Sequence, residues 1–269
     1  MSATTVTAGQ PRSSGALHVA LYFAVVYKRT WRGSVVTSFV NPIFFLLAMG
    51  VGLGSLVDNG GAAGGVDGIA YLSFVAPALV ATTAMQTGAV EASWPVLGNI
   101  KYTRSYYVML TTPLDVGSIV AGQLLWTAVR LAQSAAAYFL VMTAFGATES
   151  PWGLFAIPSG VLTGLAFAAP LMAYAATLDR ESSLVAVQRF GLIPLFLFSG
   201  TFFPVTQLPG PLQAVAYVSP LWHGVDLSRR FALGRLGWGA IAGHCLYLTA
   251  IGAVGALLAR HLLRRRLVT

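Results

Sequence analysis

Few residues in this chain could do chemistry, and the most unusual of them is Arg130. It lies within an apolar stretch, and Gln123, Thr127 and Ser134 recur with it at helical spacing. Because an arginine that faces lipid is costly, we expect this polar stripe to face protein or water. Two interpretations stay open. Arg130 borders the route of an anionic or polar substrate group, or it stabilises a helix bundle by bonding to carbonyl groups of neighbouring helices.

A second group of polar residues lies near Trp222, between the last two strongly apolar segments of the chain. His223 and Asp226 are close enough in sequence to form a metal or proton site, but two ligands are too few for a structural metal centre, so turn capping is the favoured role. His244, in the last apolar segment, is expected to be packed and hydrogen-bonded. Glu91 is expected to cap a helix or to pair with Arg104.

The sequence lacks the motifs of several enzyme classes. Lys28 and Lys101 are the only lysines, and no Gly-x-x-x-x-Gly-Lys-Ser/Thr motif is present, so the chain cannot supply a Walker-type nucleotide site. His-Glu-x-x-His and Gly-x-Ser-x-Gly are also absent. We therefore expect no catalytic residue, no metal and no cofactor in this chain, and any energy from ATP must come from a partner.

The stretch from Glu91 to Asp115 combines aromatic, basic and apolar residues. A short helix is expected from Tyr102 to Leu110, because the residue that precedes Pro113 disfavours helical backbone. Aromatic residues with an arginine among them are typical of a protein docking surface. A helix lying flat on the membrane would have the same composition.

The composition excludes a soluble protein. Of the 269 residues, 56% are hydrophobic and only 9% are charged, and the mean hydropathy is +0.73. The net charge of +8 comes from residues scattered among apolar segments, which argues against a nucleic-acid partner. Cys245 is the only cysteine, so no intrachain disulfide can form.

The apolar segments predict an all-α integral membrane protein. Six spanning helices are expected at about 35–57, 70–90, 119–146, 152–178, 184–204 and 236–260. An amphipathic interfacial helix is expected at 17–32, after a disordered cytoplasmic tail at 1–16. The membrane domain would thus occupy residues 17–269.

The fifth span is expected to break at Pro204. A short apolar helix, Leu212 to Val218, follows between Pro209-Gly-Pro211 and Ser219-Pro220 and is too short to cross the bilayer. It would be re-entrant or interfacial, because non-helical backbone at membrane depth survives only against protein or a wet cavity. A loop that merely caps the bundle is the alternative.

The distribution of lysine and arginine predicts the orientation. Most of the 16 basic residues fall on one side of the six predicted spans, which places both termini in the cytoplasm. Arg229, Arg230 and Arg235 fall on the outer side, where anionic headgroups or a polar substrate group would account for them.

Several phenylalanines on the first and fifth spans could wall a conduit, although packing against lipid or core is the default role of such residues. With Arg130 and Trp222 they make up the candidate substrate pathway: Phe44, Phe45, Phe196, Phe198, Phe202 and Phe203.

Two motifs resemble the permeases of ABC type 2 exporters, most of all the nodulation-type lipo-oligosaccharide and daunorubicin-resistance permeases. One is Phe198-Ser-Gly-Thr-Phe-Phe-Pro204 with Ser219-Pro-Leu-Trp-His223, and the other is Met109-Leu-Thr-Thr-Pro-Leu114. In that family the loop with the second motif carries the helix that contacts the ATPase. The resemblance therefore implies a coupling role for Tyr102, Arg104, Tyr106, Tyr107, Met109, Leu110, Thr112, Pro113 and Leu114.

The resemblance also implies partners and a location. Two cytosolic ATPase subunits would bind ATP and Mg²⁺, and a second permease copy or a homologous permease would complete the complex in a bacterial plasma membrane. The complex would export an amphiphile such as a lipo-oligosaccharide, another glycolipid or a hydrophobic drug. An ion-coupled carrier or multidrug efflux protein without an ATPase is the alternative, but carriers use membrane-embedded acids, and the predicted spans have none.

Overall fold

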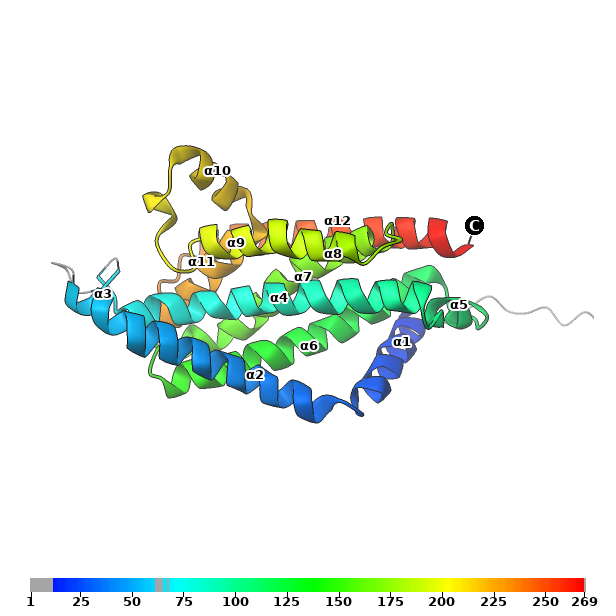
Figure 1. Cartoon of the computed structure of the whole chain (residues 1–269), viewed down its shortest axis with the longest axis horizontal. Coiled ribbons are helices and arrows are strands. Elements are labelled where there is room, and N and C mark those ends of the chain that lie inside the picture. The colour runs from blue at the N-terminus through cyan, green and yellow to red at the C-terminus, as the bar shows by residue number, and fades with distance from the viewer. Residues whose placement is uncertain (1–11, 61–64, 67, 269) are drawn as a thin grey trace, which may run out of the picture.

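The computed structural model describes residues 12–60, 65, 66 and 68–268, and this part of the chain consists of helices joined by turns and loops, with no β-strand. The all-α membrane fold is thus as predicted. The long helices lie roughly side by side, and the C-terminus lies at the same end of the bundle as helix α5 (Figure 1). The helices are α1 (Arg12–Tyr27), α2 (Trp31–Leu46), η1 (Leu47–Leu53), α3 (Gly54–Gly60), α4 (Tyr71–Lys101), α5 (Ser105–Leu110), α6 (Val116–Ala144), η2 (Pro151–Phe155), α7 (Ala156–Ala175), α8 (Ser182–Val187), η3 (Gln188–Leu192), α9 (Ile193–Phe198), η4 (Val205–Gln207), α10 (Gly210–Val218), α11 (Pro220–Leu233) and α12 (Trp238–Val268).

Five helices in the described part of the chain are long and apolar enough to cross a membrane. They are Trp31–Asn59, Tyr71–Lys101, Val116–Ala144, Pro151–Ala175 and Trp238–Val268. The predicted fifth span corresponds to a shorter apolar helix, Ser182–Phe198, whose Leu192 and Leu195 pack against α4. The second span runs to Lys101 and not to residue 90, a difference that matters for Glu91 below.

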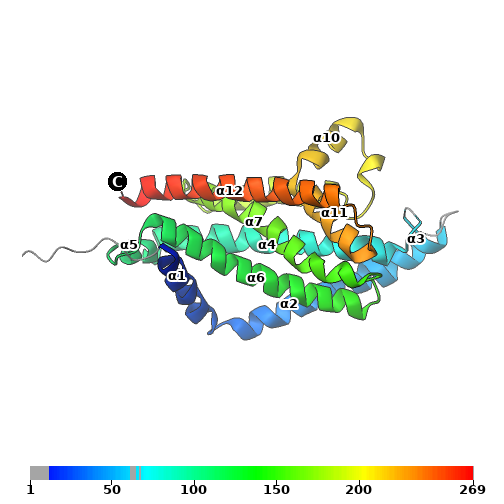
Figure 2. The same cartoon turned by 180° about the vertical axis from the view of Figure 1, so that it is seen from behind.

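Helix α1 begins earlier and packs more closely than a purely interfacial helix would. Residues 12–16, predicted to belong to a disordered tail, are helical, while the rest of that predicted tail lies outside the described residues. Val19 and Phe23 are buried in a cluster with Ile119 of α6, whereas Leu17 on the other face is exposed. Seen from behind, α1 runs obliquely beside the start of α6 (Figure 2).

Small residues bring α4 and α7 together at the centre of the bundle. A Cβ atom on Gly88 of α4 would lie 2.4 Å from the carbonyl oxygen of Gly164, so only glycine fits there. The Gly160-x-x-x-Gly164 pair of α7 thus packs within the chain. A second pair with the same spacing, Gly239 and Gly243 of α12, has open space where a Cβ atom would lie, with no atom of the described residues within 4 Å.

The fifth apolar helix ends at Phe198, before the predicted break at Pro204. Gly200 adopts φ +78°, a conformation that ends the helix and that a residue with a Cβ rarely takes. Helix α10 then matches the predicted short helix. Helix α11 was not anticipated: the Ser219 hydroxyl caps its start by accepting from the Leu221 N–H, and Gly234 at φ +69° ends it.

Candidate functional site

Helix α5 projects from one end of the bundle and is anchored by Tyr106. This side chain is fully buried, and its hydroxyl donates to Gln123 Oε1 of α6 at 3.3 Å. Met109, Leu110 and Leu114 pack partly buried against the same core cluster. These four members of the predicted coupling set therefore hold the helix in place and offer little surface to a partner.

The opposite face of α5 is open to solvent. Tyr107 is 38% exposed and Val108 is 63% exposed, and Thr112 and Pro113 beyond the helix are also exposed. Sequence reasoning missed Val108, because an uninterrupted run of apolar and aromatic residues does not show which of them face the core. The helix also begins at Ser105 and not at Tyr102, which caps the end of α4.

The turn before α5 is tied to the neighbouring loop. Arg104 takes the left-handed φ of 51°, and the exposed Tyr102 donates its hydroxyl to Glu181 Oε1 at 2.6 Å. That hydrogen bond raises the pKa of Tyr102. Lys101 Nζ donates to the Asp179 carbonyl oxygen at 3.2 Å, and so the two loops at this end of the bundle are joined.

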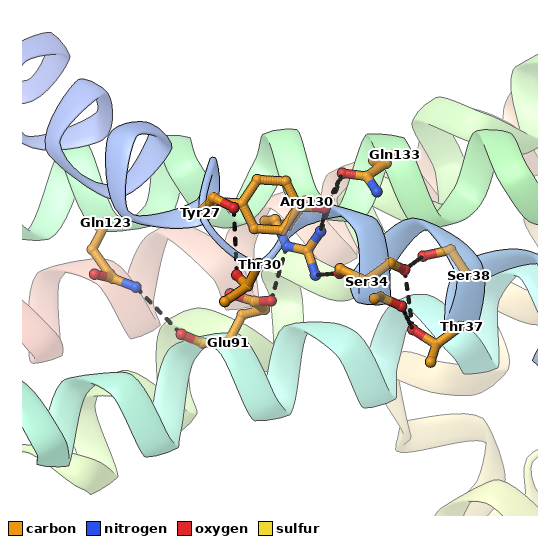
Figure 3. A network of polar contacts seen from close by, with 10 residues as sticks. Tyr27, Thr30, Ser34, Thr37, Ser38, Glu91, Gln123, Arg130 and Gln133 are labelled. Atoms are coloured by element: carbon orange, nitrogen blue, oxygen red, sulfur yellow. Dashed lines mark hydrogen bonds and ion pairs between the residues drawn. The ribbon is translucent and has the colours of Figure 1, made fainter.

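Arg130 lies at the centre of a polar network between four helices (Figure 3). Its Nε bonds to Glu91 Oε1 at 3.0 Å, its Nη2 to Ser34 Oγ at 2.6 Å, and its Nη1 to Tyr27 Oη at 2.6 Å and Gln133 Oε1 at 3.1 Å. The guanidinium also lies 4.3 Å from the centre of the Tyr27 ring. The side chains of Arg130 and Glu91 are 13% and 20% exposed. The Arg130 guanidinium thus bonds to side chains of α1, α2, α4 and α6, and not to backbone carbonyls as one interpretation supposed.

Glu91 corrects two expectations. It pairs with Arg130 and neither caps a helix nor pairs with Arg104, because α4 continues for several turns beyond it. For the same reason an acid does lie within a spanning helix, contrary to the sequence-based expectation. Gln123 continues the network, since its Nε2 donates to the Glu91 carbonyl oxygen at 3.3 Å while its Oε1 accepts from Tyr106.

The predicted aromatic pathway divides into separate groups. Phe44, Phe45 and Phe196 line a cavity of about 390 Å³ between α2, α4, α6 and α9, together with polar residues that include Gln86 and Tyr138. Phe202 joins them, with its ring centre 5.0 Å from that of Phe196 and 6.1 Å from that of Phe45.

The other predicted pathway residues lie elsewhere. Phe198 is exposed and does not line this cavity, and Phe203 packs with Trp222 and Val205 under α10. Arg130 does not line the cavity either. The structure therefore brings together four of the six phenylalanines and separates them from the arginine.

A second polar network lies near the other end of the bundle, between α11 and α12. His223 Nδ1 and His244 Nδ1 are 2.8 Å apart, and His244 Nε2 lies 2.9 Å from Asp226 Oδ2, which also accepts from Arg230 Nε at 2.5 Å. The His223 ring stacks on Tyr247 with the ring centres 4.0 Å apart. Turn capping was thus the wrong role for His223 and Asp226, which both contact His244 across the interface between α11 and α12.

The tautomers of this network follow from its geometry. Asp226 can only accept, so His244 Nε2 carries a proton, and a neutral His244 then has Nδ1 free to accept from His223 Nδ1–H. In the described part of the chain no group of three residues is arranged to hold a metal ion.

Two of the three arginines that the sequence placed on the outer side have partners within the chain. Arg229 lies over the Phe74 ring at 3.7 Å and donates to the carbonyl oxygens of Phe74 and Gly200, so it fastens α11 to α4 and to the turn after α9. Arg230 pairs with Asp226. Neither needs the lipid or substrate group that the sequence suggested.

Comparison with known proteins gives a consistent result. The family model described as ABC-2 type transporter matches residues 20–231. Nodulation protein J of Rhizobium meliloti is 32% identical over 244 residues, which cover 91% of this chain and 90% of that protein. Nodulation protein J of Rhizobium leguminosarum bv. trifolii is 32% identical over 271 residues and the full length of both chains. Nodulation protein J of Sinorhizobium fredii is 33% identical over 91% of each chain.

Proposed function

The chain belongs to the ABC-2 type transporter family, and on this premise we propose that it is the permease subunit of an ATP-driven exporter. Two copies, or one copy with a homologous permease, would assemble with two cytosolic ATPase subunits that bind ATP and Mg²⁺. Both termini would lie in the cytoplasm. The chain itself has no Walker-type motif, so hydrolysis would take place in the partner.

The observation that carries the proposal is the form of α5. A helix whose buried face is fixed by Tyr106 and whose other face exposes Tyr107 and Val108 to solvent is suited to receive a push from a bound subunit. The coupling surface is defined here as Tyr102, Arg104, Tyr107, Val108, Thr112 and Pro113, all of which are exposed.

A continuous set of hydrogen bonds leads from α5 into the bundle. Tyr106 bonds to Gln123, Gln123 to the backbone of Glu91, Glu91 to Arg130, and Arg130 to Ser34 of the first span. In the proposed mechanism, closure of the ATPase subunits moves α5, and this network transmits the movement to α2. The cavity beside α2 would change shape as a result.

The substrate would be an amphiphile that uses this cavity. Phe44, Phe45 and Phe196 give it an aromatic wall, with Phe202 packed behind Phe45 and Phe196, while Gln86 and Tyr138 offer polar groups. The Tyr138 hydroxyl is buried and makes no hydrogen bond to any residue that the structure describes, so it is free to bond to a guest. A lipo-oligosaccharide, another glycolipid or a hydrophobic drug would place its apolar part against the aromatic residues and its polar groups near Gln86 and Tyr138.

The first span is suited to pack against a second permease. Only 18% of its apolar window is buried within the chain, compared with 78% for α4, and Phe44 of α2 and Phe190 beside α9 are 69% and 82% exposed. A partner that covered these faces would lie directly beside the cavity. In the proposed complex the substrate route therefore adjoins the contact between the two permeases.

The alternative, an ion-coupled carrier, would need an acid within the membrane, and Glu91 is such an acid but is not placed to bind a coupling ion. Glu91 lies within a spanning helix, yet it is paired with Arg130 and does not line the cavity at Phe196. A coupling acid has to bind and release an ion in contact with the transport route. The exporter is therefore the better proposal.

Co-purification from the native membrane tests the proposal. A Tyr107→Ala, Val108→Ser variant should lose any ATPase that travels with the wild type, since both side chains are exposed on α5. The chain offers a matched control in Tyr217 and Val218 of α10, at the other end of the bundle, which are 39% and 69% exposed. Retention of the ATPase by the first variant, or its loss from the Tyr217→Ala, Val218→Ser control, would contradict the assignment.

A further inference from the structure

Helices α6, α7 and α12 lie together on the face seen in Figure 2. Residues of these three helices line a groove that the proposed transport function does not use. It consists of a cavity of about 520 Å³ near the start of α6 and a second of about 430 Å³ deeper in the bundle. The two cavities share Leu124 and Ala253 in their walls, so they form one continuous groove. Leu125 and Leu257 on its rim are exposed, and the groove is open to the side.

Small residues create the groove. Ala121 and Ala128 line it on α6, and Gly252, Ala253 and Ala256 line it on α12, while leucines of α7 form its floor. The wall of α6 from residue 117 to residue 128 is about 16 Å long, given a rise of about 1.5 Å per residue. This is about half of the roughly 30 Å hydrocarbon core of a bilayer, so the groove spans one leaflet.

One end of the groove is charged and the other is apolar. Asp115 and Arg260 line the end near the start of α6, at the end of the bundle where α12 reaches the C-terminus. Gly117 lies between them, because a Cβ atom there would be 2.9 Å from Asp115 Oδ2 and 3.2 Å from Arg260 Nε. The absence of a side chain leaves room for a ligand group between the carboxylate and the guanidinium.

Both charged groups keep bonding capacity for a ligand. Asp115 caps α6: its Oδ1 accepts from the Ser118 N–H at 3.0 Å and the Ser118 hydroxyl at 2.5 Å, and its carboxylate also accepts from the backbone N–H of Gly117, which leaves part of its acceptor capacity for a ligand. Arg260 is exposed and attracts the Asp115 carboxylate electrostatically, but within the residues that the structure describes it forms no hydrogen bond or ion pair. The Asp115 carboxylate can therefore accept hydrogen bonds, and the Arg260 guanidinium can donate them, at the same end of the groove.

We propose that this groove binds a phospholipid with a primary amine, of the phosphatidylethanolamine type, from the leaflet on the C-terminal side of the bundle. The phosphate bonds to Arg260, the ammonium to Asp115, and one acyl chain lies along Ala121, Ala128 and Ala253. In the proposed orientation this is the cytoplasmic leaflet. The site is separate from the cavity at Phe45 and Phe196.

Native mass spectrometry of the full-length protein in detergent, with lipids of identical acyl chains, tests the proposal. Phosphatidylethanolamine should bind about tenfold more tightly than phosphatidylcholine, whose methylated amine cannot donate to Asp115. Arg260→Gln should weaken phosphatidylethanolamine binding about tenfold, and Asp115→Asn, which preserves the helix cap, should remove the preference for it. Arg180→Gln, also an exposed arginine at this end but outside the groove, should change neither result.

The acyl chain is tested by filling the groove. Ala121→Leu with Ala253→Leu should abolish lipid binding, whereas Ala250→Leu, on an exposed position of α12 that lines neither cavity, should not. Unchanged thermal unfolding in lipid-free detergent would show that the filled variant is folded. Equal binding of phosphatidylethanolamine and phosphatidylcholine, equal competition by glycerophosphoethanolamine without acyl chains, or undiminished binding to the filled variant would each overturn the proposal.

Discussion

The bundle contains two polar networks that join helices, one built on arginine and the other on histidine. One, called the inner network after the proposed orientation, is the Arg130 network, in which the guanidinium donates to Glu91, Ser34 and Tyr27 and which contains no histidine. At the outer network, His223 and His244 share one hydrogen bond beside Asp226, and histidine changes its charge between about pH 5 and 8. The first network should therefore resist changes in pH, and the second should respond to them.

The largest expected effect is the loss of the inner ion pair. Glu91→Leu leaves the Arg130 guanidinium buried without its counter-charge, so we expect the free energy of unfolding to fall by about 3–5 kcal/mol. Glu91→Leu combined with Arg130→Met should cost less than Glu91→Leu alone, because no unpaired charge remains. Thermal and denaturant unfolding in detergent measure both. A cost below about 1 kcal/mol for Glu91→Leu would mean that water reaches Arg130 and that the network is not a packed unit.

The outer network should lose stability as the pH falls. Burial, and then the neighbouring His244, hold the pKa of His223 below its ordinary value. The unfolded chain therefore takes up a proton at His223 below about pH 6.5 while the folded chain does not, and stability declines from about pH 7 toward pH 5. One proton limits the slope to about 1.4 kcal/mol per pH unit. Two protonated rings could not keep their Nδ1 atoms 2.8 Å apart, which gives the same direction.

Unfolding midpoints measured across this pH range should show the decline in wild type and a flatter profile in His223→Gln. The groups that face His223 are His244, Asp226 and Tyr247, with Arg230 beyond Asp226. His261→Gln, an exposed histidine at the other end of α12, serves as the control and should keep the wild-type profile. If both variants keep it, the His223 proton does not contribute.

These networks also show how far sequence can lead. The stripe of Gln123, Thr127, Arg130 and Ser134 correctly indicated that Arg130 faces protein, because an apolar span gives a charged side chain no other place. Its partner Glu91 was missed. The predicted span ended at residue 90, and hydropathy does not show that a helix continues past the membrane core.

Other features depended on contacts that no local pattern reveals. The short helix α10 was predictable from its flanking prolines, but the partnership of His223 with His244 joins residues of two separate helices. Likewise, Tyr106 and Tyr107 are adjacent and chemically equal, and only packing places the first in the core and the second on the surface. The sequence predicted correctly that a short helix lies here, but it did not show which side chains of that helix are exposed.

A smaller change tests whether the inner network extends to the coupling surface. Tyr106→Phe keeps the buried ring but removes the hydrogen bond to Gln123, so it should cost about 1 kcal/mol of unfolding free energy. If the network transmits movement from α5, transport per ATP hydrolysed by the assembled complex should fall, while ATPase binding, which uses the exposed face, should not change. Unchanged coupling would confine the inner network to a structural role.

The smallest expected effect compares two arginines directly. Arg230 pairs with Asp226 as Arg130 pairs with Glu91, but its side chain is 32% exposed, one turn along the same helix from its partner. Arg230→Ala should cost only about 0.5 kcal/mol, since Asp226 keeps its bond to His244 and a half-exposed ion pair is screened by water and salt. Raising the salt concentration should reduce even this cost, yet leave the cost of Glu91→Leu almost unchanged. A large, salt-independent loss on Arg230→Ala would show that the outer network is as closed to water as the inner one, and the difference between them would then rest on histidine chemistry alone.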